Sequence, residues 1–225
     1  MKTSIFKHSF LNCTLILFVL LFLSCSGNVK NQNVDVEPKI KTNAIIIDCN
    51  YTFEQAIEGT KAPKYLIDQL ELITVHYYSM DGKMHQGQLL ANKAIVADLR
   101  VVFKEILQLK FPIAKVIPIV KYNWSDEASM NDNNTYSFCY RNASYSKHAY
   151  GLAVDINPRQ NPNRWKSAFS YRENKPLGAI YNVSAPGTFT PTNPIVILFA
   201  EKGFMWGRNF TRNYDDHHFE KKLFN

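Results

Sequence analysis

The sequence predicts an α+β fold with a central antiparallel β-sheet flanked by helices. Three observations lead to this prediction. Residues 73–78 alternate apolar and polar side chains, Asp81-Gly82 supplies a turn, and residues 86–90 return, which is typical of a β-hairpin. Residues 92–110 carry apolar side chains at helical spacing. No strand–helix–strand pattern repeats along the chain, so a parallel α/β sheet is not expected.

The first 24 residues are expected to be a signal peptide that is not part of the fold. Lys2 and Lys7 precede an apolar run over residues 14–23, which is shorter than the ~20 residues that a membrane-spanning helix needs. The stretch FLSC ends at Cys25 and resembles the lipobox of bacterial lipoproteins, in which this cysteine carries the lipid. Phe22 departs from that pattern, and a plain secretory signal with a coincidental cysteine is the alternative.

This N-terminus predicts an exported bacterial lipoprotein, anchored to a membrane and facing the periplasm or cell envelope. Residues 25–43, the lipidated cysteine and a polar stretch, are expected to form a flexible tether, and residues 44–225 the folded domain. Loss of the signal peptide with its two lysines lowers the net charge from +7 to +5. This charge suits an anionic partner such as a cell wall, and the lack of a dense Lys/Arg block argues against nucleic acid.

The folded domain is expected to start with short elements. Residues 44–49 are typical of a short strand, and residues 51–70 of helical pieces that Gly59 and Pro63 interrupt. After the hairpin, Asn92 is positioned to cap a helix that reaches about residue 110. The apolar face of this helix consists of Ile95, Leu99, Val102, Phe103 and Ile106.

The second half of the chain is expected to contain two long loops. Pro112 ends the preceding helix, and residues 115–120 are typical of a short strand. Residues 123–137 are polar and rich in turn formers, and residues 157–193 hold five of the ten prolines. Loops of this length usually carry function.

The chain is expected to close with a helix and two strands. Asn193 is positioned to cap a helix that starts at Pro194 and ends near Gly203. Residues 204–207 and 217–224 are typical of strands.

Cys49 and Cys139 are the two cysteines of the predicted folded domain. An exported protein can join such a pair in a disulfide, because its compartment is oxidising. The two residues lie 90 positions apart, so the sequence leaves open both a disulfide and two unpaired buried thiols.

The stretch SKHAYGLAVD holds two good metal ligands, His148 and Asp155. Positions seven apart on a straight strand face opposite sides, so both side chains can reach one metal ion only where the chain bends. Gly151 lies between them and accepts backbone geometry that other residues avoid. Ala153 leaves room beside such a site.

A third ligand is expected from the run YDDHHFE near the end of the chain. His218 is the preferred candidate and His217 the alternative. Two histidines and one aspartate leave one coordination position open, which is the form of a catalytic zinc site. Iron or manganese also fit these donor types. Asp215 precedes His218 by three positions and could approach a water molecule on the metal.

These two motifs resemble the zinc peptidases that cut peptidoglycan stem peptides. That family comprises D-alanyl-D-alanine carboxypeptidases and dipeptidases and L-alanyl-D-glutamate endopeptidases. Its pattern is Ser-x-His-x-x-Gly-x-Ala-x-Asp, then an acid, two residues and His. The matching positions here are Ser146, His148, Gly151, Ala153, Asp155, Asp215 and His218. The resemblance extends upstream through residues 130–146 and covers roughly residues 65–224.

The resemblance implies a hedgehog and D,D-peptidase-like fold, with residues 44–225 as a zinc peptidase domain. His148, Asp155 and His218 would bind a zinc ion (Zn2+), and Asp215 would be the general base. An aspartate at the base position, where other members carry glutamate, favours the endopeptidase branch.

The resemblance also implies how substrate would be held. Arg141 would bind a substrate carboxylate or stabilise the developing oxyanion, and Ser146 would hydrogen-bond near the ligands or the substrate. The implied partners are peptidoglycan stem peptides, bound by a monomer. Cys139 stands where related proteins usually have a polar residue, which leaves the substrate preference open.

Two functions remain possible for the chain. It is either a zinc peptidase that cleaves an L-Ala–D-Glu or a D-Ala–D-Ala bond, or an inactive zinc-bearing module that binds wall peptide or a partner protein. The presence of Asp215 favours the enzyme. We expect His217 at the rim of the cleft and Asp216 on the surface. Glu220 is expected either to contact a ligand or to be a solvated strand residue.

Overall fold

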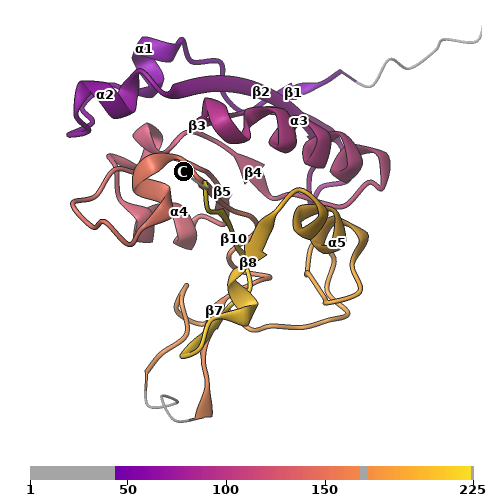
Figure 1. The fold of residues 1–225 in the computed structure, drawn as a ribbon. Helices are drawn as coiled ribbons and strands as arrows, with labels where there is room; N and C mark the ends of the chain where they lie inside the picture. Colours follow the sequence, from indigo (N-terminus) through magenta and orange to yellow (C-terminus); the bar gives the residue numbers. More distant parts are fainter. Residues whose placement is uncertain (1–43, 168–171, 224–225) are drawn as a thin grey trace, which may run out of the picture. The chain divides into compact units, whose positions relative to one another are not determined.

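The computed structural model describes residues 44–167 and 172–223 of the chain (Figure 1). The predicted signal peptide (1–24) and the predicted lipidated Cys25 with its tether (25–43) lie outside the described residues. Within the described ranges, no helix is both long enough and apolar enough to cross a membrane.

The predicted hairpin is confirmed and is longer than the sequence indicated. Strands β2 (Leu70–Tyr78) and β3 (Met84–Asn92) pair antiparallel along their whole length. The short strand β1 (Ile46–Ile47) adds to β3 in parallel. The predicted helical pieces are α1 (Phe53–Ala56) and α2 (Lys64–Ile67).

Helix α3 (Lys93–Gln108) lies along the hairpin and covers one of its faces (Figure 1). Asn92 caps it as predicted, because its side chain accepts a hydrogen bond from the amide of Ala94 at 3.0 Å. All five side chains of the predicted apolar face are buried. Each such burial contributes roughly 1.5–3 kcal/mol, so this face anchors the helix to the sheet.

A second sheet carries residues of both sequence motifs. Its strand order is β6 (Ala153–Asp155), β10 (His218–Lys221) and β8 (Phe204–Trp206), and both pairings are antiparallel. The register sets His218 opposite Asp155. Two residues 63 positions apart in the sequence are thereby made neighbours.

Helix α5 (Pro194–Glu201) packs beside β8, at the edge of this sheet (Figure 1). Asn193 caps it as predicted, through the amide of Ile195 at 2.9 Å. The rings of Phe199 and Phe219 stack with centroids 4.0 Å apart. These buried aromatic side chains give β10, and hence the second motif, a rigid backing.

The strands do not form the single central sheet that was predicted. Two more pairs stand apart from the three-stranded sheets in the described residues: β4 (Lys115–Val116) with β5 (Asn134–Thr135), and β7 (Asn163–Trp165) with β9 (Asn213–Asp215). The β1–β3 and β4–β5 pairs are parallel. The mixed α+β character is confirmed, with four small sheets in place of one.

Both predicted long loops contain regular structure. Residues 123–137 include helix α4 (Asp126–Asn131), which Ser125 caps through the amide of Ala128 at 3.2 Å. Residues 157–193 include β7. The predicted strand at 115–120 is reduced to β4 and is followed by the 3-10 helix η1 (Ile119–Tyr122).

Cys49 and Cys139 are separate, buried, free thiols. The Cys49 sulfur lies 3.6 Å from the carbonyl oxygen of Val116, and the Cys139 sulfur lies 3.6 Å from that of Trp124. Burial raises the pKa of Cys49 to about 11 and that of Cys139 to about 12. The structure therefore favours the second of the two alternatives left open by the sequence.

Candidate metal centre and active site

A tight turn brings the two halves of the first motif together. The 3-10 helix η2 (Lys147–Tyr150) carries His148, and Gly151 follows it with a φ of 66°. A Cβ on Gly151 would lie 2.8 Å from the backbone nitrogen of Asn92, so glycine is needed both for the conformation and for the space. The chain then enters β6, which carries Asp155. The bend that the sequence predicted at Gly151 is confirmed.

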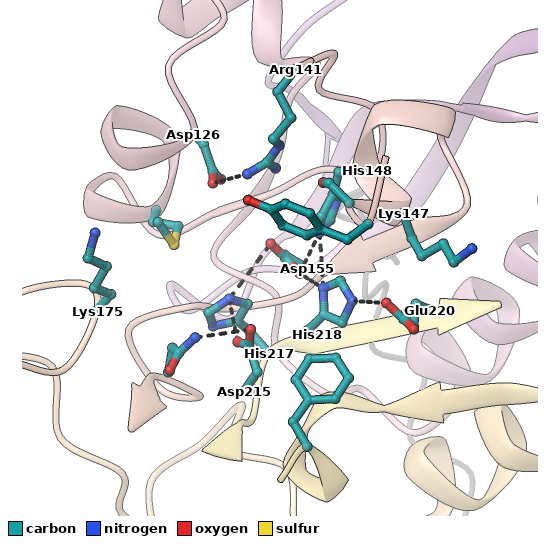
Figure 2. Close-up of a pocket in the computed structure, with 15 residues that line it drawn as sticks. Asp126, Arg141, Lys147, His148, Asp155, Lys175, Asp215, His217, His218 and Glu220 are labelled. Atoms are coloured by element: carbon teal, nitrogen blue, oxygen red, sulfur yellow. Dashed lines mark hydrogen bonds and ion pairs between the residues drawn. The ribbon is translucent and has the colours of Figure 1, made fainter. Parts of the chain in front are cut away.

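The side chains of His148, Asp155 and His218 converge (Figure 2). Nε2 of His148 lies 3.1 Å from Nδ1 of His218 and 3.1 Å from Oδ1 of Asp155. Nδ1 of His218 lies 2.9 Å from the same Oδ1. All three residues are buried. The structure thus gathers one donor atom from each of the three predicted ligands.

Hydrogen bonds behind the two histidines fix which nitrogen faces the other ligands. Nδ1 of His148 lies 2.6 Å from the carbonyl oxygen of Ser137, and Nε2 of His218 lies 3.1 Å from Oε2 of Glu220. Both oxygens can only accept, so these two ring nitrogens carry the hydrogens. In the neutral rings, the opposite nitrogens therefore present lone pairs, which is the arrangement found behind metal-ligating histidines.

This donor set fits a divalent metal ion. Two imidazole nitrogens and a carboxylate oxygen meet within hydrogen-bond distance, and either a proton on one ring or a bound cation can hold them together. Ligand bonds of about 2.0–2.1 Å in tetrahedral geometry set donor atoms about 3.3 Å apart, close to the separations seen here. Nitrogen and oxygen donors without a thiolate suit zinc, although they do not exclude iron or manganese.

Electrostatics at the centre also favour a cation. Burial opposes the charged form of His218, but hydrogen bonding to Asp155 and Glu220 outweighs it and raises the pKa of His218 to about 10. Burial likewise opposes ionisation of Asp155, yet the charges of His148 and His217 hold its pKa well below the ordinary value. A metal ion would displace the proton from His218 and take over its positive charge.

Asp215 lies at the edge of this centre, at the end of β9. Its Oδ2 accepts a hydrogen bond from Nδ2 of Asn163 at 3.1 Å. Its Oδ1 lies 2.9 Å from Nε2 of His217, outside hydrogen-bond geometry, and has no hydrogen bond. Burial opposes ionisation of Asp215, but the charge of His217 outweighs it and lowers the pKa of the carboxyl. An ionised carboxylate with one oxygen that accepts no hydrogen bond can accept a proton.

His217 is buried beside the centre, so its predicted position at the rim is wrong. Its Nδ1 lies 2.8 Å from the carbonyl oxygen of Asn161, and its Nε2 faces Asp215 and, at 3.7 Å, Oδ2 of Asp155. The cluster whose donor atoms lie within 4.8 Å of one another contains His218 and not His217. The geometry therefore favours His218 as the third ligand, as the sequence preferred.

Arg141 and Ser146 line the same cavity, which has a volume of about 350 Å³ and contains the three converging residues. Nη1 of Arg141 donates to Oδ2 of Asp126 at 3.0 Å, and this hydrogen bond holds the guanidinium beside the cavity (Figure 2). In the same site, the ring of Tyr136 stacks on that of His148, with the ring centroids 4.8 Å apart. The two predicted substrate-contacting residues are thus within the site. Their roles stay predictions.

Sequence reasoning placed Asp216 on the surface, and this is wrong. Its carboxylate is fully buried and accepts from Nη2 of Arg164 at 2.6 Å and from Nη1 of Arg208 at 2.7 Å. Its backbone oxygen accepts from Nε1 of Trp206 at 2.9 Å. The DDHH run does not indicate which of its two aspartates is buried. The burial of Asp216 depends on Arg164 and Arg208, which come from other segments of the chain.

Asn163 and Lys175 line the cavity from outside both motifs, and Lys147 lines it from a variable position within the first motif. Asn163 contacts Asp215, and the ammonium groups of Lys147 and Lys175 flank the centre on opposite sides in Figure 2. Glu220, for which the sequence left two alternatives, contacts His218. The 157–193 segment that holds Asn163 and Lys175 was predicted only as a loop of functional length.

Comparison with known proteins gives one family. Residues 140–221 match the family model described as D-alanyl-D-alanine carboxypeptidase. No curated protein and no solved structure matches the chain significantly. The matched segment contains Arg141, Ser146, the three converging residues and Asp215. The family resemblance seen in the two motifs is therefore confirmed over residues 140–221, which are similar to the D-alanyl-D-alanine carboxypeptidase family.

Proposed function

We propose that this chain is a zinc-dependent metallopeptidase that hydrolyses peptidoglycan stem peptides. The observation that carries this proposal is the convergence of two imidazole lone pairs and a carboxylate beside a second, ionised carboxylate in one cavity. The family match over residues 140–221 supports the same reaction class.

The chain's own residues would divide the chemistry among them. A divalent metal ion, when bound by His148, Asp155 and His218, lowers the pKa of a water molecule to ~7 and polarises a carbonyl group. Asp215 accepts a proton from the attacking water at Oδ1, its oxygen without a hydrogen bond, and passes it to the leaving amine. Arg141 donates to the oxyanion that forms on the scissile carbonyl, a contact worth ~3–4 kcal/mol in comparable sites.

The substrate proposed is a peptide that carries free carboxylates near the scissile bond. Arg141, Lys147 and Lys175 supply positive charge around the cavity. Either an L-Ala–D-Glu bond or a D-Ala–D-Ala bond meets this requirement, and the aspartate at position 215 favours the first.

Digestion of purified muropeptides, followed by mass analysis of the products, tests the proposal and identifies the bond. We expect hydrolysis by the wild type. Asp215→Ala should lower the rate at least ~10²-fold and keep the metal, because Asp215 is not a ligand. The matched control is Asp68→Ala, which removes an exposed carboxylate outside the cavity and should leave the rate unchanged. Full activity of Asp215→Ala would show that another group is the base, and a metal-loaded wild type without hydrolysis would favour a binding module.

The proposal includes an envelope location for the enzyme. A lipid on Cys25 would hold the catalytic domain, a monomer, at a membrane within reach of the cell wall. Detergent partitioning of the mature protein tests this anchor. We expect Cys25→Ser to move the protein into the aqueous phase. A Cys25→Ser protein that stays with the membrane would contradict lipid anchoring at this residue.

A further inference from the structure

We infer that Asn163 is a positioning residue for Asp215, and that Asn213 sets the orientation of the Asn163 amide. The inference rests on the proposed role of Asp215 as the base, and it assigns a function to β7, which lies outside both sequence motifs. Asn163 touches Asp215 and not the metal ligands.

The backbone of Asn163 is held on two sides. In the β7–β9 pair, Asn163 lies directly opposite Asp215. On its other side it forms an isolated antiparallel bridge with Lys175, in which the amide of each residue donates to the carbonyl of the other at 2.8 and 3.0 Å. The Cα of Asn163 is therefore fixed relative to Asp215, and its side chain starts from a defined place.

The side-chain amide of Asn163 has a defined direction. Nδ2 of Asn213 donates to Oδ1 of Asn163 at 3.0 Å, and Nδ2 of Asn163 donates to Oδ2 of Asp215 at 3.1 Å. A carboxylate can only accept, so the reverse orientation would set two oxygens against each other. The side chains of Asn213, Asn163 and Asp215 are thus joined by two consecutive hydrogen bonds, and we call these three side chains the relay.

This relay determines which oxygen of Asp215 is available. Oδ2 is occupied by the Asn163 amide, which opposes rotation of the carboxylate. Oδ1 has no hydrogen bond, although Nε2 of His217 faces it at 2.9 Å, and it is the oxygen to which the proposed reaction assigns the proton. Misplacement of a reacting group by about 1 Å can cost 10²-fold in rate. Asn163 can therefore affect the rate through the position of the Asp215 carboxylate, although it lies outside both motifs.

Steady-state kinetics of Asn163→Ala test the relay. We expect kcat to fall ~10–100-fold, with KM changed by less than about threefold and metal content unaltered, because substrate and metal contacts stay in place. The visible spectrum of the Co2+-substituted variant should equal that of the wild type, since the ligands are untouched. Asn174→Ala, in the same segment but outside the cavity lining, is the control and should retain full kcat.

Two substitutions at Asn213 separate positioning from folding. Asn213→Asp is nearly isosteric, but the new carboxylate would attract Nδ2 of Asn163 and turn Oδ1 of Asn163 toward Asp215. Its kcat should fall at least as far as that of Asn163→Ala. Asn213→Ala leaves the amide free to keep its bond to Asp215 and should lose only a few-fold in kcat. A purely structural role predicts the opposite order, with the isosteric change the milder one, and that order would overturn the inference.

Side-chain amide spectra of the 15N-labelled protein test the contact without any hydrolysis. We expect the Asn163 amide signals to move in Asp215→Ala and to keep their positions in Asp68→Ala. If the wild type cleaves no muropeptide while this shift is present, the proposed function fails and the positioning contact stands. If Asn163→Ala keeps the wild-type kcat, or if the Asn163 signals do not respond to Asp215→Ala, the positioning role is excluded.

Discussion

At the scale of single residues, the hydrogen bonds behind His148 and His218 decide which of their ring nitrogens face the candidate metal centre. Ser137 fixes the tautomer of His148 through its carbonyl oxygen, and Glu220 fixes that of His218 through its carboxylate. Without the second contact, the His218 ring could turn or shift its hydrogen to Nδ1, the nitrogen that faces Asp155. Glu220 is therefore part of the candidate centre, together with the three candidate ligands.

This role of Glu220 predicts a metal-affinity effect. Glu220→Ala should weaken zinc binding ~10–100-fold, as loss of an outer hydrogen-bond partner does in other sites. Glu220→Gln should weaken it less, because its amide oxygen can still accept from Nε2 of His218. Competition with a zinc chelator of known affinity measures both variants. Wild-type affinity in Glu220→Ala would show that the contact with His218 contributes nothing to the site.

Residues were predicted correctly where the motif itself fixes the chemistry, and wrongly where a distant partner does. The spacing of His148, Gly151 and Asp155 requires a bend, and the structure has it. The burial of Asp216 depends on two arginines that approach from other segments, and the burial of His217 on the carbonyl oxygen of Asn161. Such contacts leave no local trace in a single sequence.

At the scale of elements, the site depends on the turn between η2 and β6. Gly151 joins the two with a left-handed backbone, and its carbonyl oxygen accepts from the amide of Asn92 at 2.9 Å. The metal-ligand turn is thereby tied to the point where β3 passes into α3. Any side chain at position 151 would strain the left-handed backbone, and its Cβ would clash with the backbone nitrogen of Asn92.

The element-scale prediction is that Gly151→Ala destabilises the protein beyond the cost of backbone strain. Alanine in the left-handed region costs about 1–2 kcal/mol, and the clash with Asn92 adds to it. Gly178→Ala is the matched control, because Gly178 has a similar φ of 73° and no atom lies within 4 Å of the place that an added Cβ would take. Urea unfolding of both variants measures the difference. Equal free energies of unfolding would contradict the clash.

Elements held together locally were predicted, and elements that depend on distant strands were missed. The hairpin, α3 and α5 follow from alternation, periodicity and caps within one stretch of chain. Strand β7 forms because it pairs with β9, some 50 residues further along. Helix α4 was hidden by its polar composition, because few of its side chains are buried.

At the scale of the whole described structure, the largest of three buried hydrophobic clusters supports a site made from distant segments. This largest cluster joins side chains of β2, β3 and α3 to those of α5, β8 and β10. The α+β class follows from the mixture of elements, which the sequence predicts. The division into four small sheets depends on which strands meet, and pairing partners far apart in the chain could not be inferred from their patterns.

The central claim is that His148, Asp155 and His218 share one divalent metal ion, and the metal content of the purified protein tests it most directly. Elemental analysis after dialysis should find one zinc ion per wild-type chain. His148→Ala, Asp155→Ala and His218→Ala should each lose it, whereas His217→Ala should retain it because His217 lies outside the ligand cluster. A folded wild type that takes up no divalent metal, or a His148→Ala protein that holds a full equivalent, would contradict the account.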